Sequence, residues 1–99
     1  MHTVVNHLPI KPDADWGKIA SLFGGFADGV KAKYPGMVAA LLNKVSDTEA
    51  LFVGVYTDPA TMQEVSSNVA APWFAENIRP FLAGPANRLA GEVIAGFRR

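Results

Sequence analysis

The chain has 99 residues, no cysteine, and nine basic residues that balance nine acidic ones. This length corresponds to a single domain over residues 1–99, and the absence of cysteine excludes disulfides and thiolate metal ligands. The balanced charge argues against a nucleic-acid partner, and no apolar run approaches the roughly 18 residues that span a membrane. We therefore expect a cytoplasmic protein without nucleic-acid or membrane partners.

The first predicted strand covers residues 3–10, where apolar side chains precede prolines that end the strand. Asp13 or Asp15 can cap the helix that follows, because an aspartate side chain accepts from free backbone N–H groups. Apolar side chains then recur at spacings of three and four residues. They predict one buried helical stripe, made of Trp16, Ile19, Phe23, Phe26 and Val30.

Residues 36–56 contain two apolar runs joined by the polar turn Ser46-Asp47-Thr48, which predicts a β-hairpin. Strict alternation divides the first arm into two apolar faces, Met37, Ala39 and Leu41 against Val38, Ala40 and Leu42. A sheet that is apolar on both faces needs two covering layers. We expect the helices of the chain on one face and a second copy of the chain on the other.

Asp58 followed by Pro59 predicts a second helix, with aspartate as the cap and proline in the first turn. This helix is expected to run to about Val69. Pro72 is expected to open a second helical piece, so that the helix is split, and Pro80 must disturb that piece. A mouth for a ligand is predicted at the split.

The last predicted strand covers residues 87–97, with Glu92 as its only acid. The order of elements is then βαββαβ, which predicts a ferredoxin-like α+β fold with both helices on one side of a four-stranded antiparallel sheet. The other side remains apolar. A two-fold homodimer, sheet face against sheet face, would bury it.

Five segments share the order and turn positions of a known superfamily. They are Val4-Val5-Asn6-His7-Leu8, the aromatic-rich first helix, Pro35-Gly36, Val53-Gly54-Val55-Tyr56-Thr57 and Asp58-Pro59. On these segments the chain resembles the dimeric α+β-barrel superfamily and, more narrowly, antibiotic-biosynthesis-monooxygenase-like proteins. The resemblance implies a homodimer with a ligand pocket between the helices and the sheet of each subunit. The superfamily includes cofactor-independent oxygenases, haem-degrading enzymes, isomerases and stress-response proteins, so the fold alone does not select an activity.

The haem-degrading branch uses an asparagine on the first strand, a tryptophan on the second helix and a histidine further along that helix. Asn6 and Trp73 match the first two residues. The histidine has no counterpart, because His2 and His7 both belong to the first strand. Haem degradation is therefore disfavoured, and we expect neither a cofactor nor a metal.

Asn6 and His7 are the candidate catalytic residues. An imidazole titrates near neutral pH, so His7 can act as a general base towards a phenol or an enol, or it can be a structural hydrogen-bonding residue. Asn6 can hold a substrate carbonyl or an oxygen-derived anion, or it can satisfy nearby backbone groups. Strand alternation places the two side chains on opposite faces, so they cannot line the same cavity.

The candidate ligand-binding residues are Phe23, Tyr56, Trp73, Phe74 and Glu92. The aromatic residues are either plain core or the walls of a cavity for a flat apolar ligand. Glu92 is either an acid or base, or the partner of Arg79 or Arg88 in an ion pair, and these arginines can instead bind a substrate carboxylate. The leading hypothesis is a dimeric barrel that binds a small apolar or aromatic molecule, with cofactor-independent monooxygenation as its candidate activity. The alternative is a non-catalytic binding or stress-response interaction module whose core is filled by its own side chains.

Overall fold

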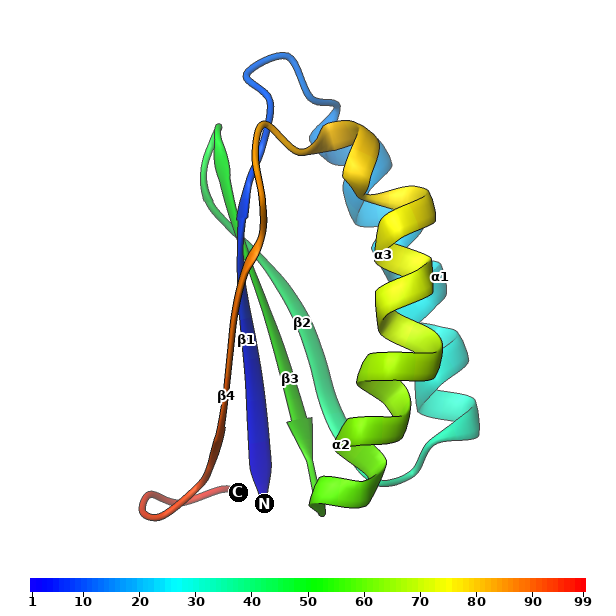
Figure 1. Cartoon of the computed structure of the whole chain (residues 1–99), viewed down its shortest axis with the longest axis vertical. Helices are drawn as coiled ribbons and strands as arrows, with labels where there is room; N and C mark the ends of the chain where they lie inside the picture. Colours follow the sequence, from blue (N-terminus) through cyan, green and yellow to red (C-terminus); the bar gives the residue numbers. More distant parts are fainter.

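The computed structural model describes residues 1–99 and confirms the ferredoxin-like α+β fold. Four antiparallel strands form one sheet in the order β2-β3-β1-β4, and the helices cover one of its faces (Figure 1). None of the helices combines the length and the hydrophobicity that a membrane-spanning segment requires. The elements in chain order are β1 (His2–Pro9), α1 (Trp16–Lys33), β2 (Met37–Ser46), β3 (Glu49–Tyr56), α2 (Pro59–Val65), a π-helical turn (Ser66–Ala70), α3 (Ala71–Asn77), a 3-10 turn (Arg79–Phe81) and β4 (Asn87–Glu92).

Helix α1 begins after Asp15, whose Oδ1 accepts a hydrogen bond from the backbone N–H of Lys18 at 3.1 Å. Trp16 is only partly buried, and its indole N–H donates to the carbonyl of Asp47 at 3.1 Å, which ties the start of the helix to the hairpin turn. The rest of the predicted stripe is buried against the sheet, as its spacing predicts: Ile19, Phe23, Phe26 and Val30.

In strand β2, the alternation of side chains between the two faces of the sheet is shifted by one residue from the prediction. The pairing with β3 shifts between Met37 and Ala39, so the strand has a β-bulge there. A bulge adds one residue to a strand and reverses the alternation beyond it. Met37 therefore lies on the same side as Ala40 and Leu42, facing the helices, while Leu41 lies on the open side. The predicted grouping of Met37 with Leu41 is wrong for this reason.

The second helical region is continuous through the position where a split was predicted. The backbone of Ala70 and Ala71 is helical, and α3 follows the π-helical turn directly. A π-helical turn holds one more residue than an α-helical turn, and this one ends two residues before Pro72, which has no backbone N–H to donate. The helix is therefore wider near Pro72, but its backbone is not interrupted there. Pro80 lies in the 3-10 turn that ends the region, as predicted.

Strand β4 is shorter than predicted and ends at Glu92. Glu92 pairs with His2, the first residue of β1, and the backbone N–H of Val93 donates one further hydrogen bond to the carbonyl of Met1 at 2.8 Å. Residues 93–99 have no regular structure, and Gly96 adopts a φ of 126°, which interrupts an extended conformation.

Candidate functional site

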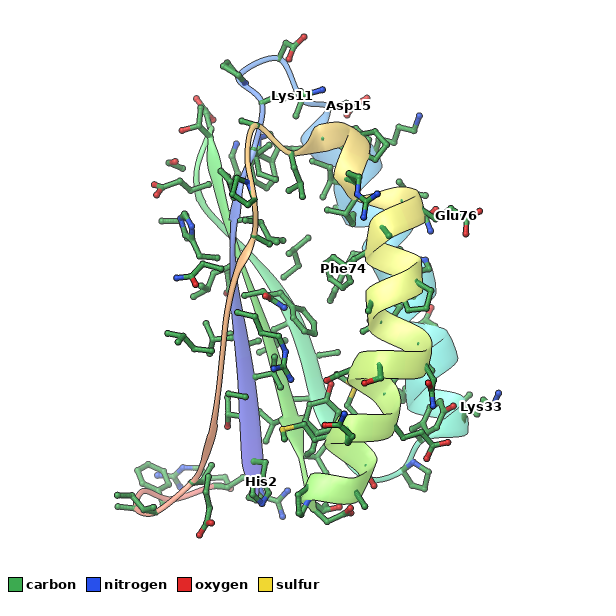
Figure 2. All side chains as sticks on the ribbon, in the orientation of Figure 1. His2, Lys11, Asp15, Lys33, Phe74 and Glu76 are labelled. Atoms are coloured by element: carbon green, nitrogen blue, oxygen red, sulfur yellow. The ribbon has the colours of Figure 1, made fainter.

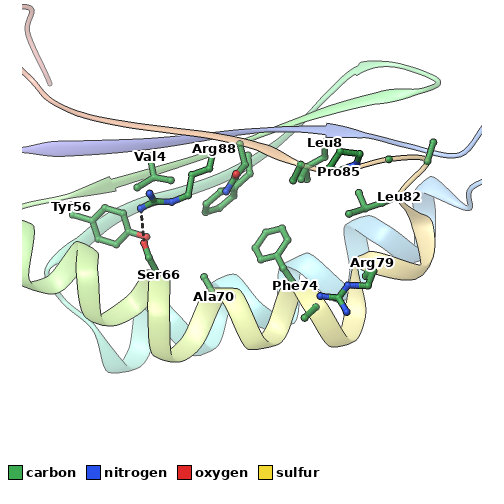
Figure 3. A pocket seen from close by; sticks show the side chains of 17 residues that line it. Val4, Leu8, Tyr56, Ser66, Ala70, Phe74, Arg79, Leu82, Pro85 and Arg88 are labelled. Carbon is green, nitrogen blue, oxygen red and sulfur yellow. Dashed lines mark hydrogen bonds between the residues drawn. The ribbon is translucent and has the colours of Figure 1, made fainter.

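A pocket lies between the helix-facing side of the sheet and the second helical region. Its volume is about 560 Å³, which falls within the roughly 300–1,000 Å³ typical of small-molecule sites. Strands β1, β3 and β4 form one wall, and the π-helical turn and α3 form the other (Figure 3). The segment 82–86, which leads into β4, closes one end.

The pocket exists because small side chains line much of it. These small residues are Ala70, Ala71, Ala75, Ala83, Gly84 and Ala86. Larger apolar side chains complete the walls, namely Val4, Leu8, Phe52, Phe74, Leu82 and Pro85. Eleven of the 17 lining residues are hydrophobic, so most of a bound molecule would contact apolar surface.

Polar side chains meet at the end of the pocket where the π-helical turn faces β4. Asn6 of β1 and Arg88 of β4 are directly paired in the sheet, so both side chains leave the same face. Arg88 Nη2 lies 3.5 Å from the Ser66 Oγ and donates a long hydrogen bond to it across the pocket (Figure 3). The side chain of Asn6 takes part in none of the hydrogen bonds within the protein. Its amide is therefore free for a ligand.

Tyr56 lines the same end and is almost fully buried, with 1% of its surface exposed. Burial raises the pKa of its phenol, and the Ser66 hydroxyl and the charge of Arg88 oppose that rise. The phenol therefore stays protonated at neutral pH and can donate a hydrogen bond, but it cannot act as a base. Gly54 leaves room for the ring, because a Cβ at Gly54 would lie 3.2 Å from the Tyr56 Oη.

Arg79 lines the opposite end of the pocket, beside Phe74 and Leu82 (Figure 3). No aspartate, glutamate or histidine is among the 17 lining residues. The site therefore combines an apolar middle with two positively charged ends. It contains no side chain that could take up a proton near neutral pH.

Three of the predicted site residues come together in this pocket: Asn6, Tyr56 and Phe74. They come from β1, β3 and α3, which lie far apart in the sequence. Whether they bind or transform a ligand stays a prediction.

Three other predicted residues lie outside the pocket. Phe23 and Trp73 belong to an aromatic cluster under α1, where their ring centroids are 6.4 Å apart. Glu92 is exposed at the end of β4 and forms no ion pair with Arg79 or Arg88. The contacts between basic side chains and carboxylates are His7–Glu49 at 3.1 Å and Lys44–Asp47 at 3.0 Å.

His7 lies on the open face of the sheet, opposite to the pocket, as strand alternation with Asn6 predicts. Its Nε2 lies 3.1 Å from the Glu49 Oε1, and Ser46 Oγ donates to the other oxygen of that carboxylate at 3.2 Å. Figure 2 places His2 at the foot of the same strand, and neither histidine lines the pocket. No group of three or more histidine and carboxylate side chains is close enough to hold a metal ion.

Ser66 and the small lining residues were not among the predicted site residues. A signal for Ser66 is present in the sequence, because Ser66, Ala70 and Phe74 follow one another at intervals of four and therefore share a helix face. The pairing of Arg88 with Asn6 has no such signal, because it depends on the register between the inner strand β1 and the edge strand β4, which come from opposite ends of the chain.

No known family model matches the sequence, and no curated protein sequence matches it. Solved structures do match in fold. A protein of unknown function from Nitrosomonas europaea has a TM-score of 0.78 at 19% identity, over 99% of this chain and 93% of that chain. A Caulobacter crescentus protein with a provisional assignment as an antibiotic biosynthesis monooxygenase has a TM-score of 0.77 at 20% identity, over 95% and 90% of the two chains.

A third match is SnoaB, a cofactor-independent oxygenase from Streptomyces nogalater. Its TM-score is 0.74 at 16% identity, over 99% of this chain and 97% of SnoaB. These similarities confirm the resemblance to antibiotic-biosynthesis-monooxygenase-like proteins at the level of the fold. The activity of this chain must be argued from its own pocket.

Proposed function

We propose that this protein binds a small, flat and mainly apolar molecule in the pocket between the sheet and α3. The single observation that carries this proposal is an open space of about 560 Å³ with an apolar middle and a few converging polar groups. This arrangement is the usual form of a small-molecule site. It favours ligand binding over the alternative of a module with a filled core.

We further propose cofactor-independent monooxygenation as the activity, supported by the fold shared with SnoaB. In such a reaction on an anthrone, the ring methylene becomes a carbonyl: one atom of O₂ enters the product, and the other leaves as water with the two methylene hydrogens. The anion that reacts with O₂ forms when the enol loses its proton. Arg88 and Asn6 can hold the oxygen of that anion and so lower the pKa of the enol. Because no lining side chain is a base, this proton passes to water at the pocket mouth.

The test is incubation of the protein with anthrones and quinols under O₂, followed by O₂ consumption and quinone absorbance. We expect turnover, and we expect Asn6→Ala and Arg88→Gln each to reduce it by about tenfold or more, as for other groups that stabilise a developing oxyanion. His7→Ala is the control. It should retain turnover, because His7 lies on the other face of the sheet.

Two results would contradict these proposals separately. Binding of an anthrone without turnover would refute the oxygenase and leave a binding protein. No turnover, no binding and no thermal shift with any compound would refute the ligand site and favour the non-catalytic interaction module.

We also propose that the open face of the sheet forms a homodimer interface. A row of apolar side chains crosses that face in register, made of Leu41, Val53, Val5 and Leu89. Leu41 is 56% exposed and Leu89 is 68% exposed in the single chain. Burying such a row stabilises a dimer by roughly 25 cal/mol per Å² of apolar area.

Light scattering tests the dimer. We expect a mass twice the 10.6 kDa of one chain. Leu89→Glu should produce a folded monomer, because it places a like charge from each copy in the interface. Ser21→Glu, on the exposed side of α1, should leave the mass unchanged. A wild-type mass of one chain would exclude this interface.

A further inference from the structure

We infer that the ligand of this pocket is an aromatic acid whose carboxylate pairs with Arg79. In this arrangement the ring system fills the apolar middle of the pocket, and a ring oxygen meets Arg88 and Asn6 at the other end. The inference rests on the proposed binding function and specifies the chemical class of the ligand.

The first argument is the charge of the pocket. The whole chain has equal numbers of acidic and basic residues, yet the 17 lining residues include two arginines and no acid. Neither arginine contacts a carboxylate of the protein, since the contacts of this kind are His7–Glu49 and Lys44–Asp47. Both arginine side chains are exposed and therefore solvated, so an anionic ligand can approach either of them without displacing a carboxylate of the protein.

The second argument is that the two arginines have different surroundings. Arg88 faces Asn6 and donates to Ser66, so one end already has a polar network suited to a carbonyl or hydroxyl oxygen. Arg79 donates no side-chain hydrogen bond within the protein, and Glu76, one turn earlier on α3, does not pair with it. Its guanidinium is therefore the free cation of the site.

The third argument is the spacing of the charges. Arg88 and Arg79 lie at opposite ends of the pocket, with the ring of Phe74 between them (Figure 3). A molecule that satisfies both must be elongated and must present a flat apolar middle to Phe74. A single guanidinium is a planar fork of donors, which matches a carboxylate.

The experiment compares two three-ring probes, anthraquinone-2-carboxylate and its neutral analogue anthraquinone-2-carboxamide. Both contain the ring carbonyls, and only the first is charged. Titration calorimetry with the full chain should give a dissociation constant about five- to tenfold lower for the carboxylate than for the amide. A difference of this size lies between the contribution of an exposed ion pair and that of an enclosed charge-assisted hydrogen bond. Added salt should reduce this preference.

Three variants locate the origin of the preference. Arg79→Gln should weaken carboxylate binding to the level of the amide and leave amide binding unchanged. Arg88→Gln should weaken both probes, because both contain the carbonyl. Arg98→Gln removes the same charge near the end of the chain, outside the pocket, and should change neither. Thermal unfolding of each variant checks that it is folded.

The results distinguish this inference from the proposed function. Equal affinity for both probes, or a preference that survives in Arg79→Gln, would overturn the carboxylate inference while the binding site remains. Failure of both probes to bind, or to shift thermal unfolding, would overturn the binding site and the inference with it.

Discussion

The layer between the sheet and the helices has two halves that use the same sheet face in opposite ways. Under α1 the space is filled by aromatic rings whose centroids lie 4.6–6.4 Å apart: Phe23, Phe26, Phe52, Trp73 and Phe74. Under α3 the same layer is lined by alanines and a glycine and contains the pocket. Both halves are apolar. The small side chains under α3 therefore account for this pocket, since hydrophobicity is common to both halves.

Phe74 forms the boundary between the two halves. Its ring centroid lies 5.9 Å from that of Phe26 and 5.4 Å from that of Phe52, and its other side lines the pocket. The rigid aromatic cluster thus supports one wall of the pocket. The following predictions test this division, from the largest expected effect to the smallest.

Phe26→Ala should have the largest effect on stability. Phe26 is 6% exposed and contacts three other aromatic rings, so its removal leaves a cavity in the packed half. We expect the free energy of unfolding, measured by chemical denaturation, to fall by about 3–5 kcal/mol. Phe97→Ala is the matched control. Phe97 is 86% exposed. If the free energy of unfolding falls no more in Phe26→Ala than in that control, the close packing under α1 is contradicted.

The same substitution in each half should separate packing from open space. Ala50 is completely buried on β3, so Ala50→Leu should lower the free energy of unfolding by about 1–3 kcal/mol through overpacking. Ala75 lines the pocket, so Ala75→Leu should stay within about 0.5 kcal/mol of the wild type. It should nevertheless weaken binding of anthraquinone-2-carboxamide, because the new side chain occupies ligand space. Equal destabilisation by both variants would mean that the pocket is not open in solution.

The fall in the free energy of unfolding at alkaline pH should depend on Tyr56. Burial raises the pKa of its phenol in the folded protein. As the pH rises above about 10, the unfolded chain releases this proton before the folded chain does, so stability falls in that range. Tyr56→Phe should make the free energy of unfolding less dependent on pH there. If the free energy of unfolding of Tyr56→Phe falls with alkaline pH as steeply as that of the wild type, this role of Tyr56 is contradicted.

The smallest effect is expected at Asp58, the cap of α2, remote from both halves. The backbone N–H of Thr61 donates to Asp58 Oδ1 at 2.8 Å and, with the Thr61 and Thr57 hydroxyls, lowers the pKa of the carboxyl. A lowered folded-state pKa gives stability that is present above the unfolded-state value and is lost as the pH falls below about 4. Asp58→Asn should therefore make the melting temperature, measured by thermal unfolding, depend less on pH in the acidic range. Asp13→Asn is the control, because Asp13 is exposed and caps no helix.

The prediction of the candidate site from the sequence succeeded where a residue's neighbours are close in sequence. Strand alternation placed Asn6 and His7 on opposite faces, and the structure agrees. The aromatic residues on the second helix could not be assigned in this way. Trp73 and Phe74 are adjacent in sequence, yet only Phe74 lines the pocket, because the π-helical turn and the packing on α1 set the rotation of α3.

The sequence by itself determined the order of elements, the buried stripe of α1 and the cap at Asp58, because these depend on local periodicity and on hydrogen bonds within a few residues. For the start of α1 it allowed Asp13 or Asp15, and the structure selects Asp15. Only the tertiary structure decided the phase of β2 after its bulge, the end of β4 and the meeting of Asn6 with Arg88. These features depend on strand register and on the volume left between packed layers. Both are set by contacts between residues far apart in the chain.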